Sequence, residues 1–324
     1  MGRRSLRPAD GLIPAFLRGD ARACGRLLTM AEAGDPAFRP LYDRIFPRIG
    51  RASRTGITGP PGAGKSTLVD RLVDLHRRRS RRVGVLAVDP TSPFTGGALL
   101  GDRIRMSTAS RDAGVFVRSM ATRGSLGGLA RCAVEACDVL DAFGCEEILV
   151  ETVGVGQAEA DIVSATDTVV VVLHPGTGDA VQAMKAGMME IGDLLVVNKA
   201  DLPGAERLAA DVEGAIELAA PRGAWRAPVL LASAERGEGI EEIAAAIERH
   251  REFLVEGPPG LEAARRSKRE AHLRRVLEEA LGSMILDEKG YAKLLARSLG
   301  SSGRGPYAVA TEILERVRRS LPSQ

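Results

Sequence analysis

Between residues 54 and 254, short segments rich in Val, Ile and Leu alternate with longer segments of mixed polarity. The longer segments place apolar residues at helical spacing, as in residues 67–75, which is typical of amphipathic helices. The short apolar runs are typical of strands that are buried on both faces. We therefore predict an α/β fold with a mainly parallel sheet flanked by helices. The expected strands lie at residues 54–58, 83–88, 147–150, 168–173, 194–197 and 228–231.

The two ends of the chain lack strand-like runs. Residues 21–33 have helical spacing. The sequence Gly-Pro-Pro-Gly at 257–260 is a strong break, and a charged helical segment, 261–281, follows it. A last helix is predicted at 307–321. We thus divide the chain into an N-terminal helical extension (1–50), the α/β domain (51–256) and a C-terminal helical region (257–324), which either covers the α/β domain or pairs with a second copy.

Composition narrows the class of protein. With 324 residues, of which 44% are hydrophobic and 27% charged, the chain is long enough for one large α/β domain with helical additions. Lys+Arg 45 against Asp+Glu 42 leaves a net charge of +3, which gives no basis for nucleic-acid binding. The four cysteines form no C-x-x-C pair, and no apolar stretch is long enough to span a membrane. We expect a cytoplasmic protein with reduced thiols.

A complete phosphate-binding loop lies at Gly59–Ser66, which reads G-P-P-G-A-G-K-S. It meets the pattern G-x-x-x-x-G-K-[ST] between a predicted strand and a predicted helix. Glycines are needed because backbone N–H groups must turn toward phosphate oxygens without obstruction by side chains. We expect Lys65 to reach the β- and γ-phosphates and the Ser66 hydroxyl to bind Mg²⁺. The expected nucleotide contacts of this loop are Gly59, Pro60, Pro61, Gly62, Ala63, Gly64, Lys65, Ser66 and Thr67.

A second element, Asn198-Lys199-Ala200-Asp201, follows the predicted strand at 194–197. The Asp201 carboxylate can accept from both the N1–H and the exocyclic amino group of guanine, whereas adenine offers no such pair of donors. Asn198 and Lys199 would brace the base and the loop, and Ser233-Ala234 would offer a backbone N–H to guanine O6. The alternative is an ordinary strand-to-helix turn. After a phosphate loop, the element favours GTP and GDP as ligands.

Three carboxylates are candidates for the metal. Asp89 and Glu151 end predicted strands, and Asp102 follows a segment rich in Gly, Ser and Thr. At the carboxyl edge of the sheet they would hold Mg²⁺ directly or through water, and the Gly154 N–H would contact the γ-phosphate. The alternative for each carboxylate is a helix cap or a surface charge. With Lys65 they would promote phosphoryl transfer to water, and no residue is a convincing lone base.

Several long stretches resemble a known family. They are Gly56–Thr67, Asp89–Arg103, Arg118–Leu129, Glu151–Glu159 and Pro175–Gly187, together with Asn198–Asp201. On these residues the chain resembles the MeaB/ArgK group of P-loop GTPases, the chaperones of adenosylcobalamin-dependent acyl-CoA mutases. Ala158, where Ser is expected, and His174, where an apolar residue is more usual, depart from the pattern. Neither position is needed for nucleotide chemistry.

The resemblance implies properties that spacing alone does not. It implies a homodimer joined largely by the helical tail, and a slow GTPase that a mutase accelerates. It also implies that the protein gates cofactor loading and protects or repairs the mutase, with methylmalonyl-CoA mutase as the first candidate client. Mobile elements would lie at residues 89–102, 151–159 and 176–185. Further switch or catalytic candidates are Gln157, Asp179, Lys185, Arg105 and Arg123.

Three alternatives stay open at this point. Nickel metallochaperone GTPases share the expected fold and guanine element, but they usually carry His-rich tracts, and the four histidines here are isolated. A P-loop kinase would need an acceptor pocket and would have no use for the guanine element. The third alternative is a nucleotide-dependent binding protein in which hydrolysis only resets the bound state.

Overall fold

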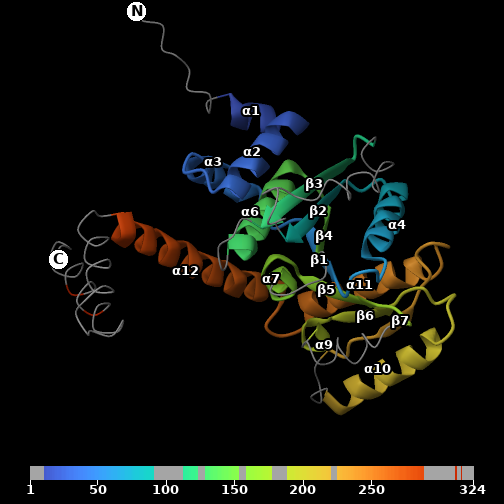
Figure 1. The fold of residues 1–324 in the computed structure, drawn as a ribbon. Helices are drawn as coiled ribbons and strands as arrows, with labels where there is room; N and C mark the ends of the chain where they lie inside the picture. Colours follow the sequence, from blue (N-terminus) through green and yellow to red (C-terminus); the bar gives the residue numbers. More distant parts are fainter. Residues whose placement is uncertain are drawn as a thin grey trace, which may run out of the picture. The chain divides into compact units, whose positions relative to one another are not determined.

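The computed structural model describes residues 11–90, 112–122, 128–152, 158–176, 188–219 and 225–287, with residues 311 and 315. The chain forms two compact units, residues 1–268 and 269–324. In the described part of the first unit, a seven-stranded parallel sheet is the central element (Figure 1). Its strands are β1 (Ser53–Thr58), β2 (Val83–Pro90), β3 (Val115–Thr122), β4 (Glu147–Thr152), β5 (Thr168–Leu173), β6 (Leu194–Val197) and β7 (Val229–Leu231).

The order of the strands places β1 at a central position. The order is β3-β2-β4-β1-β5-β6-β7, so β1 pairs with β4 on one side and with β5 on the other. Ile57 lies beside Glu151, and Thr58 lies beside Val171. In open α/β sheets, ligands bind beyond the carboxyl ends of the strands where the strand order reverses. The loop after β1 therefore occupies the place where a ligand is expected.

The predicted fold class is confirmed, but one strand escaped the sequence analysis. The strand β3 reads V-F-V-R-S-M-A-T and pairs only with β2 at the edge of the sheet. Its residues Val115–Ser119 are half-buried. Arg118 and Ser119 interrupt its apolar residues, so β3 has no continuous apolar run. The apolar-run criterion found the other six strands, including the edge strand β7, and missed β3.

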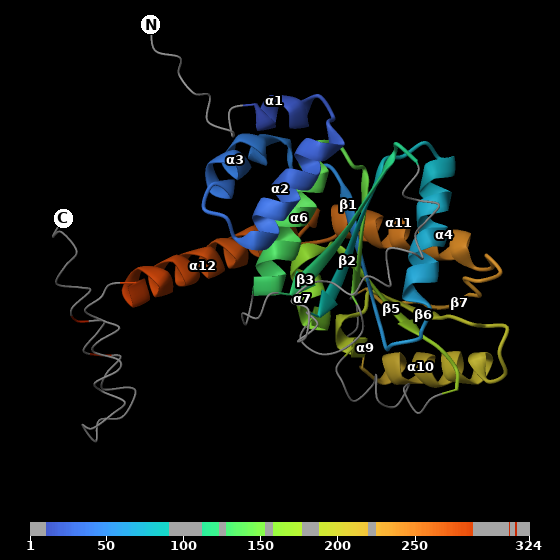
Figure 2. The same cartoon turned by 45° about the horizontal axis from the view of Figure 1, so that its top comes forward.

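Helices cover both faces of the sheet (Figure 2). On one face, Val170 and Val172 share a core with residues of α4 and α11; on the other, Val169 and Val171 share a core with residues of α6, α7 and α10. Adjacent residues of β5 thus contribute to different cores, as the two-residue period of a strand requires. The helices that flank the sheet on its two faces are α4 (Lys65–Arg78), α6 (Gly128–Phe143), α7 (Ala158–Ala165), α9 (Met188–Ile191), α10 (Ala205–Ala219) and α11 (Ile240–Glu256).

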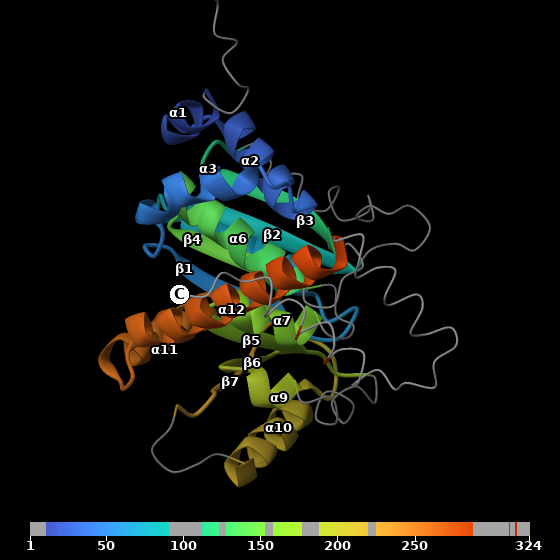
Figure 3. The same ribbon diagram turned by 90° about the vertical axis from the view of Figure 1, so that its left-hand side faces the viewer.

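Three short N-terminal helices pack on α6 within the first unit (Figure 3). They are α1 (Leu12–Leu17), α2 (Ala21–Ala33) and α3 (Phe38–Ile45), followed by the 3₁₀ turn η1 (Phe46–Arg48). The helix predicted at 21–33 is confirmed. It begins where Asp20 accepts hydrogen bonds from the N–H groups of Arg22 and Ala23, and it ends at Gly34 with a φ of 62°. Both signals are standard helix boundaries.

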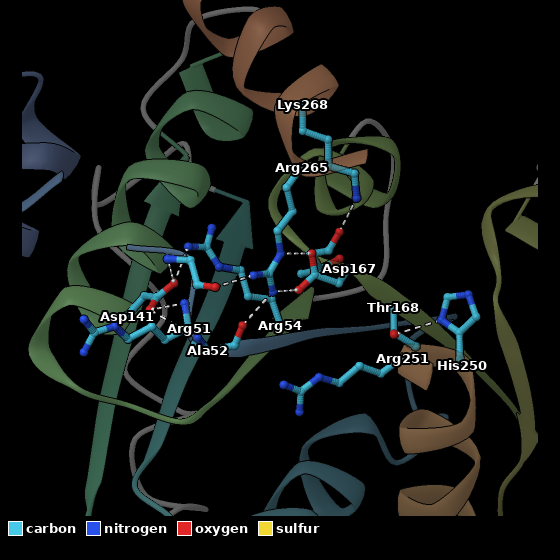
Figure 4. Close-up of polar contacts among 12 residues, drawn as sticks. Arg51, Ala52, Arg54, Asp141, Asp167, Thr168, His250, Arg251, Arg265 and Lys268 are labelled. Carbon is cyan, nitrogen blue, oxygen red and sulfur yellow. Dashed lines mark hydrogen bonds and ion pairs between the residues drawn. The ribbon is translucent and has the colours of Figure 1, made fainter. Parts of the chain in front are cut away.

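A buried arginine fastens the start of α12 (Leu261–Asp287) to the amino edge of the sheet (Figure 4). Arg265 donates to both carboxylate oxygens of Asp167, at 3.0 and 2.6 Å, and to the carbonyl oxygens of Gly50 and Ala52, at 2.6 and 2.7 Å. The two side chains are only 10% and 9% exposed. Lys268 donates to the carbonyl of Thr166. One guanidinium therefore ties α12 to the residues just before β1 and β5.

Two carboxylates of α6 also bind the amino edge of the sheet, at the start of β1. Arg54 of β1 lies 2.8 Å from both Asp138 and Asp141. The Asp141 carboxylate also accepts from the N–H groups of residues 50, 51 and 52. The chain that enters β1 is thus held by backbone and side-chain hydrogen bonds at once. Buried charges are tolerated here because each has several partners.

In the second unit, the structure describes α12 from Arg269 onward and residues 311 and 315. Leu273, Leu277 and Leu281 are exposed along this part of α12. The helix predicted at 261–281 is confirmed, whereas the one predicted at 307–321 falls almost wholly outside the described residues. The domain boundaries at residues 50 and 256 stay predictions. Among the described helices, none is both long and apolar enough to cross a bilayer.

We predict that Arg265→Ala lowers the free energy of unfolding by about 3–5 kcal/mol, because it leaves the Asp167 carboxylate buried without its cation. Urea denaturation followed by circular dichroism measures the change. Arg266→Ala is the matched control, since Arg266 is exposed on the same turn of α12. Equal losses in the two variants would contradict the role given to Arg265.

Candidate nucleotide-binding site

The loop between β1 and α4 has a backbone that only glycine adopts easily. Gly59, Gly62 and Gly64 have φ values of 138°, 76° and 87°. A Cβ at Gly59 would lie 2.0 Å from the carbonyl oxygen of Val172, and one at Gly64 would lie 2.3 Å from Nδ2 of Asn198. Glycine is thus required at both positions by close packing as well as by the left-handed backbone. The loop wraps tightly between its neighbours and follows the pattern expected of a phosphate cradle.

The helix after the loop presents its amino end toward the same space. The helix α4 begins at Lys65 after Gly64, and no described side chain caps it. Its first N–H groups and its dipole therefore favour an anion at this end. The tip of the loop, Pro61 and Gly62, is exposed, as is Thr67 on the helix. These features are what a bound phosphate chain needs.

Two polar side chains of the loop are already engaged within the protein. Nζ of Lys65 is buried and donates to the carbonyl oxygens of Gly59 and Pro60, at 2.7 and 2.9 Å. The Ser66 hydroxyl donates to Oε1 of Glu151 at 2.6 Å. The structure therefore brings together Ser66 and Glu151, two of the residues predicted to hold a metal. A hydroxyl and a carboxylate are hard oxygen ligands of the kind that Mg²⁺ prefers.

Glu151 reaches this position because β4 runs beside β1. It is 5% exposed, and the next residue, Thr152, donates to the Thr58 hydroxyl at 2.9 Å. Asp89 lies near the end of β2 at the same edge of the sheet, where its backbone pairs with Ala121. The other predicted residues of this region lie outside the described residues: Asp102, Gly154, Gln157, Asp179, Lys185, Arg105 and Arg123.

Asn198 joins the phosphate loop to the loop after β7. Its Nδ2 donates to the carbonyl oxygen of Ala63 at 2.8 Å, and its Oδ1 accepts from the N–H of Ala234 at 3.0 Å. The side chain is 2% exposed. Lys199 follows with a φ of 58°, which turns the chain sharply at the end of β6. The predicted bracing residues thus lie between the two loops that would hold the phosphates and the base.

Asp201 is paired with the loop after β7. Its Oδ1 accepts from the Ser233 hydroxyl at 2.7 Å, and its Oδ2 lies 3.6 Å from Nη2 of Arg236. The hydrogen bond from Ser233 is the main reason why the pKa of Asp201 lies below its ordinary value, and Arg236 contributes in the same direction. An ionised carboxylate at neutral pH is a strong acceptor for two N–H donors. Guanine offers such a pair on one edge.

The loop after β7 differs in one detail from the sequence expectation. A backbone N–H of Ser233-Ala234 was predicted to bind guanine O6, but the Ser233 N–H donates to Glu238 and the Ala234 N–H donates to Asn198. A contact with O6 would require one of these bonds to be shared or exchanged. The sequence analysis also missed two arginines: Arg71, which donates to carbonyl oxygens of the loop after β7, and Arg236, which lies near the Asp201 carboxylate. No local motif marks either residue. Arg71 contacts a segment that is distant in the sequence, and Arg236 lies outside the four-residue element that contains Asp201.

The sheet order and the glycine-shaped loop after β1 define the fold of a P-loop nucleoside triphosphatase. The family model described as Methylmalonyl Co-A mutase-associated GTPase MeaB matches residues 24–289. The chain belongs to this family of GTP-hydrolysing enzymes. The family resemblance stated from the sequence is therefore confirmed.

Relatives and a solved structure agree with the family. A putative GTPase of Pyrococcus abyssi is 46% identical over 313 residues, which cover 95% of this chain and 96% of that protein. GTPase ArgK of Escherichia coli is 37% identical over 238 residues, which cover 71% of this chain and 72% of that protein. The crystal structure of LAO/AO transport system kinase is 26% identical, with a TM-score of 0.73, and covers 97% of this chain and 100% of that chain.

We predict that Gly64→Ala weakens GDP binding at least tenfold. A Cβ would meet Asn198 in a backbone region that costs non-glycine residues about 1–2 kcal/mol. The loop would relax from its cradle shape, and binding would have to restore that shape. Titration with a fluorescent GDP analogue measures the affinity. The control is Gly214→Ala, since a Cβ there meets nothing within 4 Å. Unchanged affinity in a folded Gly64→Ala protein would refute this assignment.

Proposed function

We propose that this GTPase gates cofactor loading and protects or reactivates an adenosylcobalamin-dependent acyl-CoA mutase, with methylmalonyl-CoA mutase as the first candidate. The family description, which names a mutase-associated GTPase, supports the choice of client. The Asn198 side chain that links the phosphate loop to the base loop supports a site that responds to a whole guanine nucleotide. The choice of client thus rests on the family description, and the proposed response to the bound nucleotide rests on the contacts of Asn198.

We assign roles to the residues of the site as follows. Lys65 exchanges its bonds to Gly59 and Pro60 for bonds to the β- and γ-phosphates. Asp201 accepts from the guanine edge. The residues that would hold Mg²⁺, directly or through water, are Ser66, Asp89, Asp102 and Glu151. The bound Mg²⁺ would supply charge neutralisation at the phosphates.

Catalysis in this scheme is positioning and electrostatic stabilisation of transfer to water. Lys65 stabilises negative charge that develops on the phosphates, and the Gly154 N–H is assigned to the γ-phosphate. The free enzyme would be slow if a cation is supplied only when the mutase binds. Arg105, Arg123 and Lys185 are the candidates of this chain for that cation.

The proposed assembly is a homodimer in the cytoplasm, joined through the C-terminal region. Its proposed organisation is an N-terminal extension (1–50), a GTPase domain (51–256) and a dimerisation region (257–324). The exposed leucines of α12, at positions 273, 277 and 281, are compatible with burial against another surface. Exposed apolar side chains of one helix face often mark such a contact.

A kinase is the second candidate function, because the similar solved structure is named a transport system kinase. The base site discriminates between the two functions. We predict that Asp201→Asn lowers GTP affinity at least tenfold and confers binding of xanthosine triphosphate. An amide can donate to the C2 oxygen of xanthine but repels the guanine amino group, and one lost charged hydrogen bond is worth about 1.5–3 kcal/mol.

Competition of unlabelled nucleotides against a fluorescent analogue measures this change. Asp211→Asn is the control, since Asp211 is exposed on α10. A wild-type protein that binds ATP as well as GTP, or an Asp201→Asn protein that keeps its preference for GTP, would contradict the guanine site and favour the kinase.

We predict that purified adenosylcobalamin-dependent methylmalonyl-CoA mutase co-elutes with the protein in a nucleotide-dependent manner and raises the GTP hydrolysis rate at least tenfold. Size-exclusion chromatography with a non-hydrolysable GTP analogue or GDP measures the first effect, and phosphate release measures the second. The Gly64→Ala variant controls for nucleotide dependence. No complex and no acceleration with this mutase would rule it out as the client. Capture of a hydrogenase or urease maturation factor from native lysate would favour the nickel metallochaperone.

A further inference from the structure

A single arginine of the phosphate-binding helix grips the loop that carries the base site. Arg71 lies on α4, beyond Lys65 and Ser66. Its Nε donates to the carbonyl oxygen of Ala234 at 2.8 Å, and its Nη2 donates to the carbonyl oxygen of Glu235 at 2.6 Å. A planar guanidinium can hold two neighbouring carbonyl oxygens at fixed spacing, which a lysine ammonium cannot do. The contact therefore fixes the orientation of two consecutive peptide groups.

We propose that Arg71 is a positioning residue for guanine recognition, which holds the turn after Ser233 so that its N–H groups face the O6 atom of the base. This inference rests on the guanine site proposed above. It adds a residue outside the Asn-Lys-x-Asp element and outside the phosphate loop. Arg71 acts through the backbone of residues 234–236 and does not touch the base.

The geometry of the peptide bond carries the argument. In a trans peptide the C=O and the N–H point in opposite directions. The carbonyl groups of Ala234 and Glu235 point at Arg71. The N–H groups in the same two peptide planes, those of Glu235 and Arg236, therefore point away from α4. Arg71 thereby determines which side of the turn presents donors.

The other donors of this turn are already engaged. The Ser233 N–H donates to the carbonyl oxygen of Glu238 at 3.1 Å, and the Ala234 N–H donates to Asn198 at 3.0 Å. The Gly237 N–H closes the turn on the carbonyl oxygen of Ala234 at 3.3 Å. Within the described part of the chain, no acceptor takes the N–H groups of Glu235 and Arg236. These two groups are therefore the donors that we assign to O6.

The base of this turn is held independently of Arg71. Ser233 and Glu238 exchange hydrogen bonds of 3.1 Å in both directions and form an isolated antiparallel bridge. Loss of Arg71 should thus free the tip of the turn without unfolding its base. Because Arg71 shares α4 with Lys65 and Ser66, the same rigid helix sets the register between the phosphate end and the base end of the site.

The test is the binding preference of Arg71→Ala and Arg71→Lys for GDP, IDP and ADP, measured by competition against a fluorescent nucleotide. IDP keeps O6 and N1–H but lacks the amino group that Asp201 would bind. We expect both variants to bind GDP and IDP about tenfold more weakly, by the same factor for each, while the weak ADP binding stays unchanged. Lysine should not restore the preference, because it cannot hold both carbonyl oxygens.

Arg78→Ala is the matched control, since Arg78 is exposed further along α4. Circular dichroism and the thermal midpoint without nucleotide identify any variant that fails to fold. If Arg71→Ala does not fold, the nucleotide preference of Arg71→Lys decides the test. An unchanged GDP-to-ADP preference in a folded Arg71 variant would overturn the inference. A loss of the same factor for GDP, IDP and ADP would also overturn it, because that result indicates a general structural role. If the wild-type protein shows no preference for guanine, the proposed base site itself fails, which is a separate outcome.

Discussion

The Asn198 side chain is the contact on which the site depends. It donates to the phosphate loop at Ala63 and accepts from the base loop at Ala234, and it is almost completely buried. A buried amide is stable only when its donor and acceptor groups are satisfied, so its partners must keep their positions. Gly64 lacks a side chain in the space that Asn198 fills. One residue thus joins the phosphate loop to the loop after β7, the two segments proposed to bind the two ends of the nucleotide.

The two edges of the sheet carry different kinds of residues: candidate ligand-binding residues at the carboxyl edge and structural ion pairs at the amino edge. The carboxyl edge carries the phosphate loop after β1, the metal candidate Glu151 at the end of β4, and the loops after β6 and β7 with the base candidates. At the amino edge, Arg265, Arg54, Asp141 and Asp167 form a buried network that fastens α12 and α6 to the strand starts. Asp167 lies two residues after the end of α7, the helix that begins at Ala158, beyond Glu151 in the sequence. The buried contacts at the amino edge would therefore keep the strand starts in place if the loops at the carboxyl edge rearranged.

Much of this arrangement could be read from the sequence, because its signals are local. The buried strands have continuous apolar runs, and the phosphate loop and Asn198–Asp201 element have fixed short spacings. The edge strand β3 lacks such a run and was missed. Arg265 and Arg71 were missed for another reason: each binds backbone carbonyls of segments far away in the sequence, and nothing in their neighbours marks that contact. Long-range contacts to the backbone depend on the packed fold and leave no pattern in the residue types.

Three polar side chains of the candidate site are bonded within the protein, and this bears on the nucleotide binding proposed above. Lys65 is bonded to loop carbonyls, Ser66 to Glu151, and Asp201 to Ser233. A nucleotide therefore exchanges hydrogen bonds with the protein, and the net gain from each is only the difference between two good contacts. Under the proposed function, the internal contacts of the site would therefore differ between the nucleotide-bound and the nucleotide-free protein. Release of the Ser66–Glu151 contact would change one side-chain contact at the end of β4, while the pairing of β4 with β1 and β2 would hold its backbone. Such a difference in contacts is what the proposed gating of a partner by the bound nucleotide requires.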